Sequence, residues 1–230
     1  GRVFYQDSAE ELRLLVTSDG LEPVGLMQAR REKPDPATFL GSGKIEELAE
    51  LAGESGADVV VFDIALSAAQ ERNIERILNI PVLDRTELIL DIFRQRAKSR
   101  EGRLQVELAR LEHLSTRLVR GWTHLERQRG GLGKTGGPGE KQIELDRRMI
   151  GVRMKQLRDQ LKRLARQRGT QRRSRSRGDA LTVSLAGYTN AGKSTLFNRL
   201  TRAQTYAADQ LFATLDTTAR RFWLNDEETV

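Results

Sequence analysis

The stretch "GYTNAGKSTLFN", residues 187–198, constrains the fold more than any other part of this sequence. Its spacing, G-x-x-x-x-G-K-[ST], is satisfied in full by Gly187, Gly192, Lys193 and Ser194. The apolar run "LTVSLAG" precedes it, and the helix-forming run "STLFNRL" continues it. A strand, a glycine-rich loop and a helix in this order bind phosphate, because backbone N–H groups can wrap the anion and the helix N-terminus is electropositive. The sequence therefore predicts a phosphate loop that opens an α/β domain at residues 181–230.

The residues of this loop have predicted roles toward a nucleotide. Lys193 would reach the β- and γ-phosphates, and the Ser194 hydroxyl would bind Mg²⁺. Downstream, the segment "TYAADQLFATLDTT", residues 205–218, is polar and rich in threonine. Mobile switch loops of this kind carry a threonine that senses the γ-phosphate through Mg²⁺. Spacing alone leaves four candidates for that residue, namely Thr205, Thr214, Thr217 and Thr218.

The first 99 residues alternate strand and helix signals. Two short apolar runs, 11–17 and 23–29, are separated by a turn. Strands that alternate with helices predict a small α/β domain around a parallel sheet. The elements predicted after these runs are helices over 42–56, 66–78 and 85–99, strands over 57–63 and 80–84, and the helix N-caps Ser67 and Thr86.

The net charge of +7 is distributed unevenly along the chain. Residues 1–93 carry 9 Lys or Arg against 18 Asp or Glu, and residues 179–230 carry 5 against 6. Residues 94–178 carry 25 against 8. So basic a segment between two acidic neighbours indicates a polyanion partner. The alternative is a solvated helical surface that is merely rich in arginine.

The basic segment has the pattern of two long helices. Apolar residues recur at steps of three, four and seven over 101–128 and again over 140–168, which is the seam of amphipathic helices that pack together. Six Gly and one Pro between 130 and 139 interrupt them. We expect an antiparallel hairpin over 100–168 with a glycine-rich tip at 129–140. A flexible basic linker is expected to follow at 169–180.

A long basic hairpin of this kind suits insertion into a cleft lined by RNA, because Arg and Lys neutralise phosphates and guanidinium planes stack on bases. Two simpler interpretations remain open: Trp122 packs against the other arm, or the tip is only a linker. The RNA-binding candidates are Arg120, Trp122, His124, Arg127, Arg129, Lys134, Lys141, Arg147 and Arg148.

Composition excludes several other classes of protein. The chain has no Cys, which rules out disulfides and thiolate metal sites, and its two histidines are too few for a His-rich cluster. No apolar run approaches the roughly 20 residues of a membrane helix. We expect a cytoplasmic protein without a membrane span.

"GYTNAGKSTLFNRL" followed by "ADQLFATLD" resembles GTPases of the Obg–HflX group. "VVFDIALSAAQERNIERI", "DRTELILDIFRQRA" and "GPGEKQIELDRR" are similar to the HflX family in particular. The resemblance implies that GTP is bound and hydrolysed to GDP, and that the partner is the large ribosomal subunit. It also implies that the hairpin tip reaches ribosomal RNA near the peptidyl transferase centre, and that stalled ribosomes are split or rescued under stress.

The same resemblance selects Thr214 as the switch threonine, so that Lys193 and Thr214 are the catalytic candidates and Ser194 and Thr214 the Mg²⁺ ligands. It also links Asn190 to K⁺. The family usually has Pro where this chain has Thr217, which is expected to loosen the switch loop. The implied nucleotide-binding residues are Gly187, Asn190, Ala191, Gly192, Lys193, Ser194 and Thr195.

A family member would continue with D-x-x-G and N-K-x-D motifs, and this chain ends at "NDEETV". We therefore expect an incomplete GTPase domain, with activity in the intact protein but not in this chain alone. Two other functions are kept: an RNA-binding module that nucleotide only regulates, and a phosphate-loop ATPase or kinase. Nucleotide-independent binding to large subunits would favour the first, and equal use of ATP and GTP the second.

Overall fold

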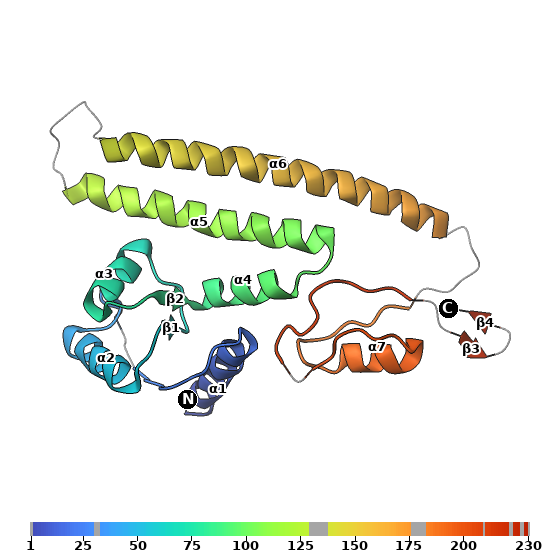
Figure 1. Ribbon diagram of the computed structural model, residues 1–230, viewed down its shortest axis with the longest axis horizontal. Coiled ribbons are helices and arrows are strands. Elements are labelled where there is room, and N and C mark those ends of the chain that lie inside the picture. The colour runs from blue at the N-terminus through green and yellow to red at the C-terminus, as the bar shows by residue number, and fades with distance from the viewer. Residues whose placement is uncertain are drawn as a thin grey trace.

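The computed structural model describes residues 2–29, 33–128, 138–175, 183–208, 210–220, 223–225 and 228–229. Two long helices lie side by side above a smaller group of helices and strands, and α7 lies beside that group (Figure 1). The elements of the described residues are, in order, α1 Arg2–Ser18, α2 Ser42–Ser55, β1 Val60–Phe62, α3 Ala68–Leu78, β2 Val82–Asp84, α4 Arg85–Arg96, α5 Arg100–Gln128, α6 Pro138–Arg175, α7 Lys193–Thr201, β3 Trp223–Asn225 and β4 Glu228–Thr229.

The N-terminal part is built around a β-α-β unit, which confirms the predicted fold class. Strands β1 and β2 pair in parallel, with Val60 beside Val82 and Phe62 beside Asp84, and α3 connects them. Parallel strands need such a crossover, because a tight turn can join only antiparallel ones. The predicted helices at 42–56, 66–78 and 85–99 correspond to α2, α3 and α4.

Side-chain caps begin two of these helices. Ser67 caps α3 as predicted, since its hydroxyl accepts the N–H of Gln70 at 3.2 Å and the Gln70 side chain accepts the N–H of Ser67 at 3.0 Å. The prediction of Thr86 as the cap of α4 is wrong. Asp84 caps this helix, and its carboxylate accepts the N–H of Glu87 at 2.9 Å. Asp84 is suited to both positions, because the extended backbone of a strand's last residue is also that of an N-cap.

Two apolar runs do not form strands. Residues 11–17 belong to helix α1, and residues 23–29 have no regular secondary structure. Leu12, Leu15 and Val16 share one helical face, and Leu15 is buried against Leu88 and Ile92 of α4. The run at 11–17 is too short for its periodicity to distinguish a helix from a strand, so packing against α4 decides its structure.

The strand expected at "LTVSLAG" is also not formed over the part that the structure describes, residues 183–187. Val183 and Leu185 are exposed there. A strand requires a neighbour for its N–H and C=O groups. No strand pairs with this segment among the described residues, where β3 and β4 pair only with each other.

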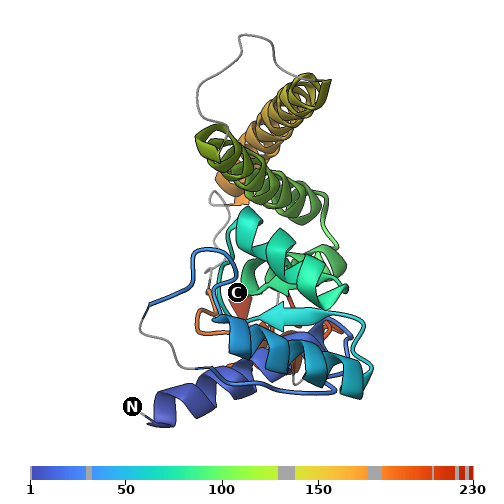
Figure 2. The same cartoon turned by 90° about the vertical axis from the view of Figure 1, so that its left-hand side faces the viewer.

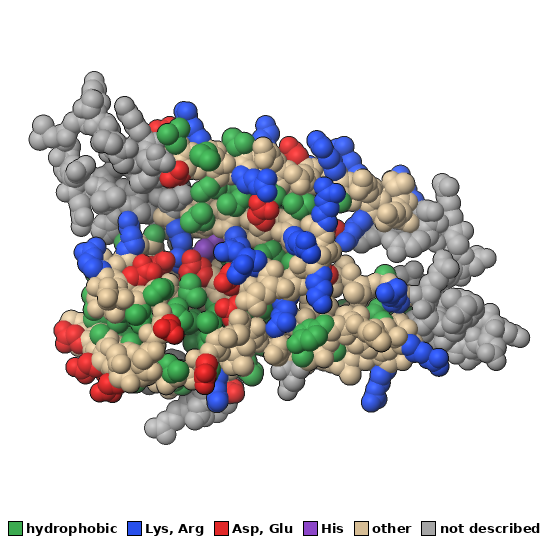
Figure 3. Space-filling model, in the orientation of Figure 1, with side chains coloured by type: hydrophobic (Ala, Val, Ile, Leu, Met, Phe, Trp, Pro, Cys, Tyr) green, Lys and Arg blue, Asp and Glu red, His purple; other side chains and the backbone are tan. Residues whose placement is uncertain are grey.

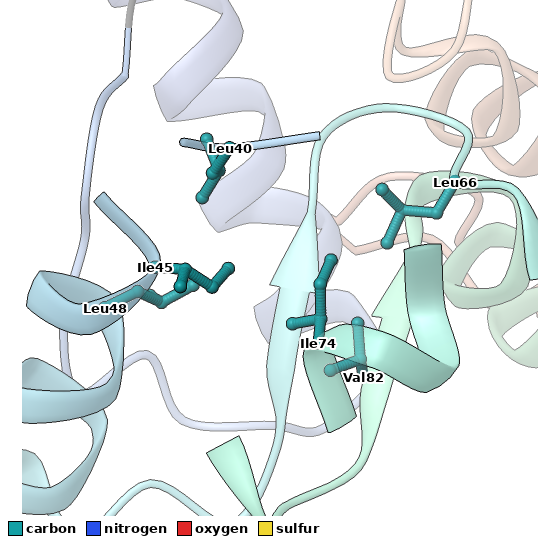
Figure 4. Close-up of a cluster of buried hydrophobic side chains, with 6 residues drawn as sticks. All are labelled: Leu40, Ile45, Leu48, Leu66, Ile74 and Val82. Carbon is teal, nitrogen blue, oxygen red and sulfur yellow. The ribbon is translucent and has the colours of Figure 1, made fainter. Parts of the chain in front are cut away.

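The main hydrophobic core joins α2, α3 and the strands, and Figure 4 shows its side chains converging between these elements. Ile74 is fully buried and Val82 nearly so. Burying an aliphatic side chain of this size contributes about 1.5–3 kcal/mol. The cluster consists of Leu40, Ile45, Leu48, Leu66, Ile74 and Val82.

The long helices form the predicted antiparallel hairpin, which lies across the N-terminal part with α5 between that part and α6 (Figure 2). At 1.5 Å per residue, the 29 residues of α5 and the 38 of α6 span about 43 and 57 Å. Leu157 is fully buried in the seam. Among the described side chains, three ion pairs join the arms, at N–O distances of 2.6, 2.7 and 2.8 Å: Arg153–Glu107, Arg158–Glu112 and Arg168–Glu101.

The end of the second arm differs from the prediction. Helix α6 continues to Arg175, through most of the segment expected to be a flexible linker at 169–180. Arg and Gln are good helix formers, so a lone Gly169 does not end the helix. Residues 176–180 lie outside the described residues.

The hairpin is fixed to the N-terminal part by Arg117 of α5. Its guanidinium contacts Glu71 of α3, lies 2.9 Å from an oxygen of Asp84, and lies 2.6 Å from one of Glu87. Burial is the main cause that raises the pKa of Glu71 from 4.5 to about 7, with Arg117 opposing the rise and nearby carboxylates adding to it. One arginine past the middle of α5 thus joins the first hairpin arm to α3, β2 and α4.

Candidate functional site

The phosphate loop ends where helix α7 begins. Gly192 is the N-cap of α7 and has φ 75°, a left-handed conformation that glycine adopts without the steric cost of a Cβ. Asn190 also has a positive φ of 59°. Tight turning at these two positions brings the chain into the helix, whose first N–H groups have no partner within the helix.

The side chain of Lys193 folds back over this loop. Its Nζ donates a hydrogen bond to the carbonyl oxygen of Tyr188. A Cβ added at Gly187 would lie 3.8 Å from Lys193 Cδ. The ammonium group therefore lies against the backbone that the pattern assigns to phosphate binding. Thr195, on the first turn of α7, is exposed, as are Asn190 and Ala191.

Ser194 and Thr214 are brought together from segments 20 residues apart. The Ser194 hydroxyl donates to Thr214 Oγ1 at 3.0 Å, and the Thr214 hydroxyl donates to the carbonyl oxygen of Tyr206 at 2.8 Å. Of the four threonines that spacing left open, Thr214 makes the contact with the loop. Thr205 instead pairs through its backbone with the side chain of Asn198.

The separation of these two hydroxyls fits a magnesium ion. In octahedral coordination with bonds of about 2.1 Å, neighbouring ligand oxygens are about 3.0 Å apart. Ser194 Oγ and Thr214 Oγ1 lie 3.0 Å from each other. Two neutral hydroxyls are weak ligands alone, so this donor set suits an ion that also binds phosphate oxygens and water.

Residues 205–218, hereafter the switch segment, pack against the N-terminal part. Phe212 contacts Phe93 of α4, and the Asp216 carboxylate accepts the N–H groups of Lys98 and Ser99. Sequence reasoning did not identify Asp216, because its partners precede it by more than 110 residues and no local spacing reports such a contact.

The cations of α6 include two groups with different surroundings. Arg153, Arg158 and Arg168 pair with carboxylates of α5. The other group is exposed, and within the described part of the chain none of its members has an ion pair: Arg147, Lys155, Lys162, Arg163 and Arg166. Basic side chains gather over α5 and α6 in Figure 3, whereas acidic ones gather at the lower left, over α2.

Most RNA-binding candidates lie beyond what the structure describes. Arg147 is exposed, and Arg148 forms an exposed pair with Glu144 at 3.5 Å. Arg129 and Lys134 lie outside the described residues. Only the helical backbone is described, and not the side chain, at Arg120, Trp122, His124, Arg127 and Lys141.

Three protein-family models match successive parts of the chain. They are described as GTP-binding GTPase N-terminal over residues 6–94, GTP-binding GTPase middle region over 96–175, and 50S ribosome-binding GTPase over 182–230. A GTPase HflX of Escherichia coli is 57% identical over 220 residues, and one of Magnetococcus marinus is 54% identical over 217. These alignments cover 96% and 94% of this chain.

The chain belongs to the HflX family of GTPases. It spans about half the length of the HflX relatives it matches, 51% and 50% for these two. The family assignment confirms the resemblance seen in the sequence, and the second matched region ends where helix α6 ends, at Arg175.

Solved structures agree on the fold. A crystal structure titled as a complex of SsGBP with GDP has a TM-score of 0.57 and 21% identity, covering 97% of this chain and 57% of that one. A GTP-binding protein from Sulfolobus solfataricus, also in complex with GDP, has a TM-score of 0.52 and 18% identity, covering 96% and 55%. As for membranes, none of the helices described is both long and apolar enough to cross one.

Proposed function

We propose that the intact protein is a ribosome-associated GTPase. It binds the large ribosomal subunit and uses the binding and hydrolysis of GTP to split or rescue stalled ribosomes under stress. The main observation in favour of GTP binding is the 3.0 Å contact between Ser194 of the phosphate loop and Thr214 of the switch segment. Membership of the HflX family and the matched region described as a 50S ribosome-binding GTPase support the choice of partner.

Different groups of the loop would bind different parts of a nucleoside triphosphate. The N–H groups of the loop from Gly187 to Thr195 would hold the phosphates, aided by the dipole of α7. Lys193 would leave the Tyr188 carbonyl and neutralise the β- and γ-phosphates. The Mg²⁺ that Ser194 and Thr214 would hold would supply positive charge against the negative charge that develops during hydrolysis.

Ser194 and Thr214 would hold that ion. The Thr214 hydroxyl can keep its hydrogen bond to the Tyr206 carbonyl while a lone pair of Oγ1 turns to the metal. The Ser194 hydroxyl would have to release Thr214, because two oxygens bound to one cation cannot share a proton between them. Asn190 is the residue we propose to contact K⁺, and a comparison of activity in K⁺ and Na⁺ would test this.

Measurements of nucleotide binding by the full-length protein test the proposed GTP and Mg²⁺ site directly. We expect GTP to bind far better than ATP, and Mg²⁺ to strengthen GTP binding. Ser194→Ala should lose most of the Mg²⁺ dependence, and Thr201→Ala is the matched control, because it removes a hydroxyl at the far end of α7 that bonds only within the helix and to the next loop. Equal use of ATP and GTP would favour an ATPase or kinase instead.

The proposed binding to ribosomal RNA depends on the exposed, unpaired cations of α6. Lys162 and Arg166 are four residues apart on one exposed face, where phosphates can reach both. Removing two phosphate contacts should reduce the slope of log affinity against log salt by about 1.4–1.8, at about 0.7–0.9 for each contact. The variant is Lys162→Gln with Arg166→Gln, and the assay is binding to isolated large subunits at several salt concentrations.

A matched control removes the same number of charges from the seam. Arg158→Gln with Arg168→Gln unpairs Glu112 and Glu101, and should weaken the contact between α5 and α6 more than it changes the salt slope. If both double variants changed the slope equally, or neither did, the unpaired face would have no special part in binding RNA.

A further inference from the structure

The switch segment is held on both sides of Thr214 by the corner between α4 and α5. This corner, residues 93–103, is also the base of the first hairpin arm. Contacts through Asp216, Phe212, Gln210 and Tyr206 join the two regions.

Asp216 is bound to the N-terminus of α5. Its carboxylate accepts the N–H of Lys98 at 2.6 Å and that of Ser99 at 2.7 Å, and also the Ser99 hydroxyl. Ser99 Oγ in turn accepts the N–H of Gly102 at 2.9 Å. Burial raises the pKa of Asp216, but these hydrogen bonds and the charge of Arg103 together lower it below its ordinary value. The contact is thus built for an ionised carboxylate.

Gly102 makes room for that carboxylate. A Cβ added at Gly102 would lie 2.3 Å from Asp216 Oδ1 and 3.1 Å from Ser99 Oγ. Real Cβ atoms do not approach an oxygen so closely, so any side chain at position 102 would displace Asp216. A glycine in the first turn of a helix is otherwise a poor choice, since alanine favours the helix more.

Phe212 is seated on α4, two residues before Thr214. Its ring lies edge-on to Phe93, with centroids 4.9 Å apart, and packs on the buried cluster of Leu15, Leu88 and Ile92. Its φ is 55°, a left-handed conformation that is unfavourable for a residue with a large side chain. Burial of the ring therefore holds the backbone in a shape it would not adopt alone.

Gln210 adds a polar contact. Arg96 donates to Gln210 Oε1 at 2.9 Å, and its guanidinium carbon lies 5.4 Å from the centre of the Tyr206 ring. Tyr206 is the residue whose carbonyl oxygen accepts the Thr214 hydroxyl. The residues that surround Thr214 therefore contact the hairpin base, while Thr214 itself contacts Ser194.

We propose that Asp216 and Phe212 are positioning residues, which hold Thr214 beside Ser194 and couple nucleotide binding at the phosphate loop to the base of the helical hairpin. This inference rests on the proposed function, because Thr214 must sense the γ-phosphate. Coupling between two sites is reciprocal. A ligand that fixes Thr214 therefore also favours contact between the switch segment and the base of α5, and a ligand that favours this contact also fixes Thr214.

The test uses the full-length protein and two variants that leave Thr214 intact. Gly102→Ala displaces Asp216 by steric conflict, and Asp216→Asn removes the charge while keeping the shape. Gly151→Ala is the matched control, because nothing lies within 4 Å of a Cβ added at this hairpin glycine. Dissociation constants are measured with Mg²⁺ for GDP and for a non-hydrolysable GTP analogue.

We expect both variants to bind the GTP analogue about tenfold more weakly, within the usual 5–150-fold range of coupled sites, and GDP within about twofold of the wild type. The control should match the wild type for both nucleotides. A merely structural defect would weaken the two nucleotides alike. Equal weakening, or unchanged binding of the GTP analogue in both variants, would overturn the inference.

Amide hydrogen exchange at residues 100–106 measures whether the nucleotide state changes the first turns of α5. In the wild type, exchange there should differ between the GTP-analogue and GDP states, and in Gly102→Ala the difference should disappear. A difference that survives in Gly102→Ala would contradict the coupling. Failure of the wild type and the Gly151→Ala control to bind any guanine nucleotide would contradict the proposed function itself, which is a distinguishable result.

Discussion

Arg117 Nη2 lies 2.9 Å from Asp84 Oδ2, and the Asp84 side chain has no solvent exposure. Asp84 is also the last residue of β2 and the N-cap of α4. One ion pair thus joins the hairpin, the sheet and a helix N-terminus. Any movement of α5 relative to the N-terminal part must keep this pair or break it.

Arg117→Leu should destabilise the protein strongly. It leaves Asp84 buried and unpaired and removes the partner of Glu71 and Glu87, and breaking a buried pair in this way costs about 3–5 kcal/mol. Urea unfolding measures the loss. Arg110→Leu is the control, because Arg110 is 46% exposed and lies 3.6 Å from Asp91, and an exposed pair contributes about 0–1 kcal/mol. Similar losses in the two variants would contradict the importance of the buried cluster.

The stability of the protein should depend on pH through Glu71. Its pKa rises from 4.5 to about 7 on folding, mainly because of burial, so the folded state binds this proton more tightly than the unfolded state. The stabilising effect is complete below pH 4.5 and is lost as pH rises to about 7. Measured against Glu71→Gln, which cannot ionise, the wild type should lose free energy of unfolding across that window. A difference that stays constant from pH 4.5 to 7 would contradict the shift.

Lys193→Ala should abolish nucleotide-dependent action on ribosomes and leave the fold intact. Lys193 hydrogen-bonds only to a loop carbonyl in the described structure, so its removal leaves no buried charge unpaired. Affinity for GTP should fall at least tenfold, since a positive charge beside two phosphates is lost. Circular dichroism checks the fold and titration with a fluorescent GTP analogue the affinity. Wild-type affinity in this variant would remove Lys193 from the nucleotide site.

Local patterns were enough to predict much of this fold. The hairpin has a strong helical period, and Ser67 lies three residues before the Gln70 with which it forms a capping box, so both could be found in the sequence. The phosphate loop has a fixed spacing, but spacing left four threonines open. The family resemblance selected Thr214, and this is the one of the four that contacts Ser194.

Features that depend on distant partners could not be predicted. The run at 11–17 forms a helix because its apolar face packs on α4, and residues 183–187 of "LTVSLAG" form no strand because no neighbouring strand is paired with them among the described residues. Gly102 illustrates the limit most clearly. Its role is set by Asp216, which follows it by 114 residues, and neither residue has a local pattern that reports the other.

In the function proposed above, the nucleotide state at Ser194 and Thr214 controls binding to the large ribosomal subunit. Co-sedimentation of the full-length protein with isolated large subunits tests it most directly, with a GTP analogue, with GDP and without nucleotide. Binding should be much stronger with the GTP analogue than in the other two states, and this difference should be lost in Thr214→Ala. Equal binding in all three states would leave an RNA-binding module without nucleotide control, and no binding in any state would contradict the ribosome as partner.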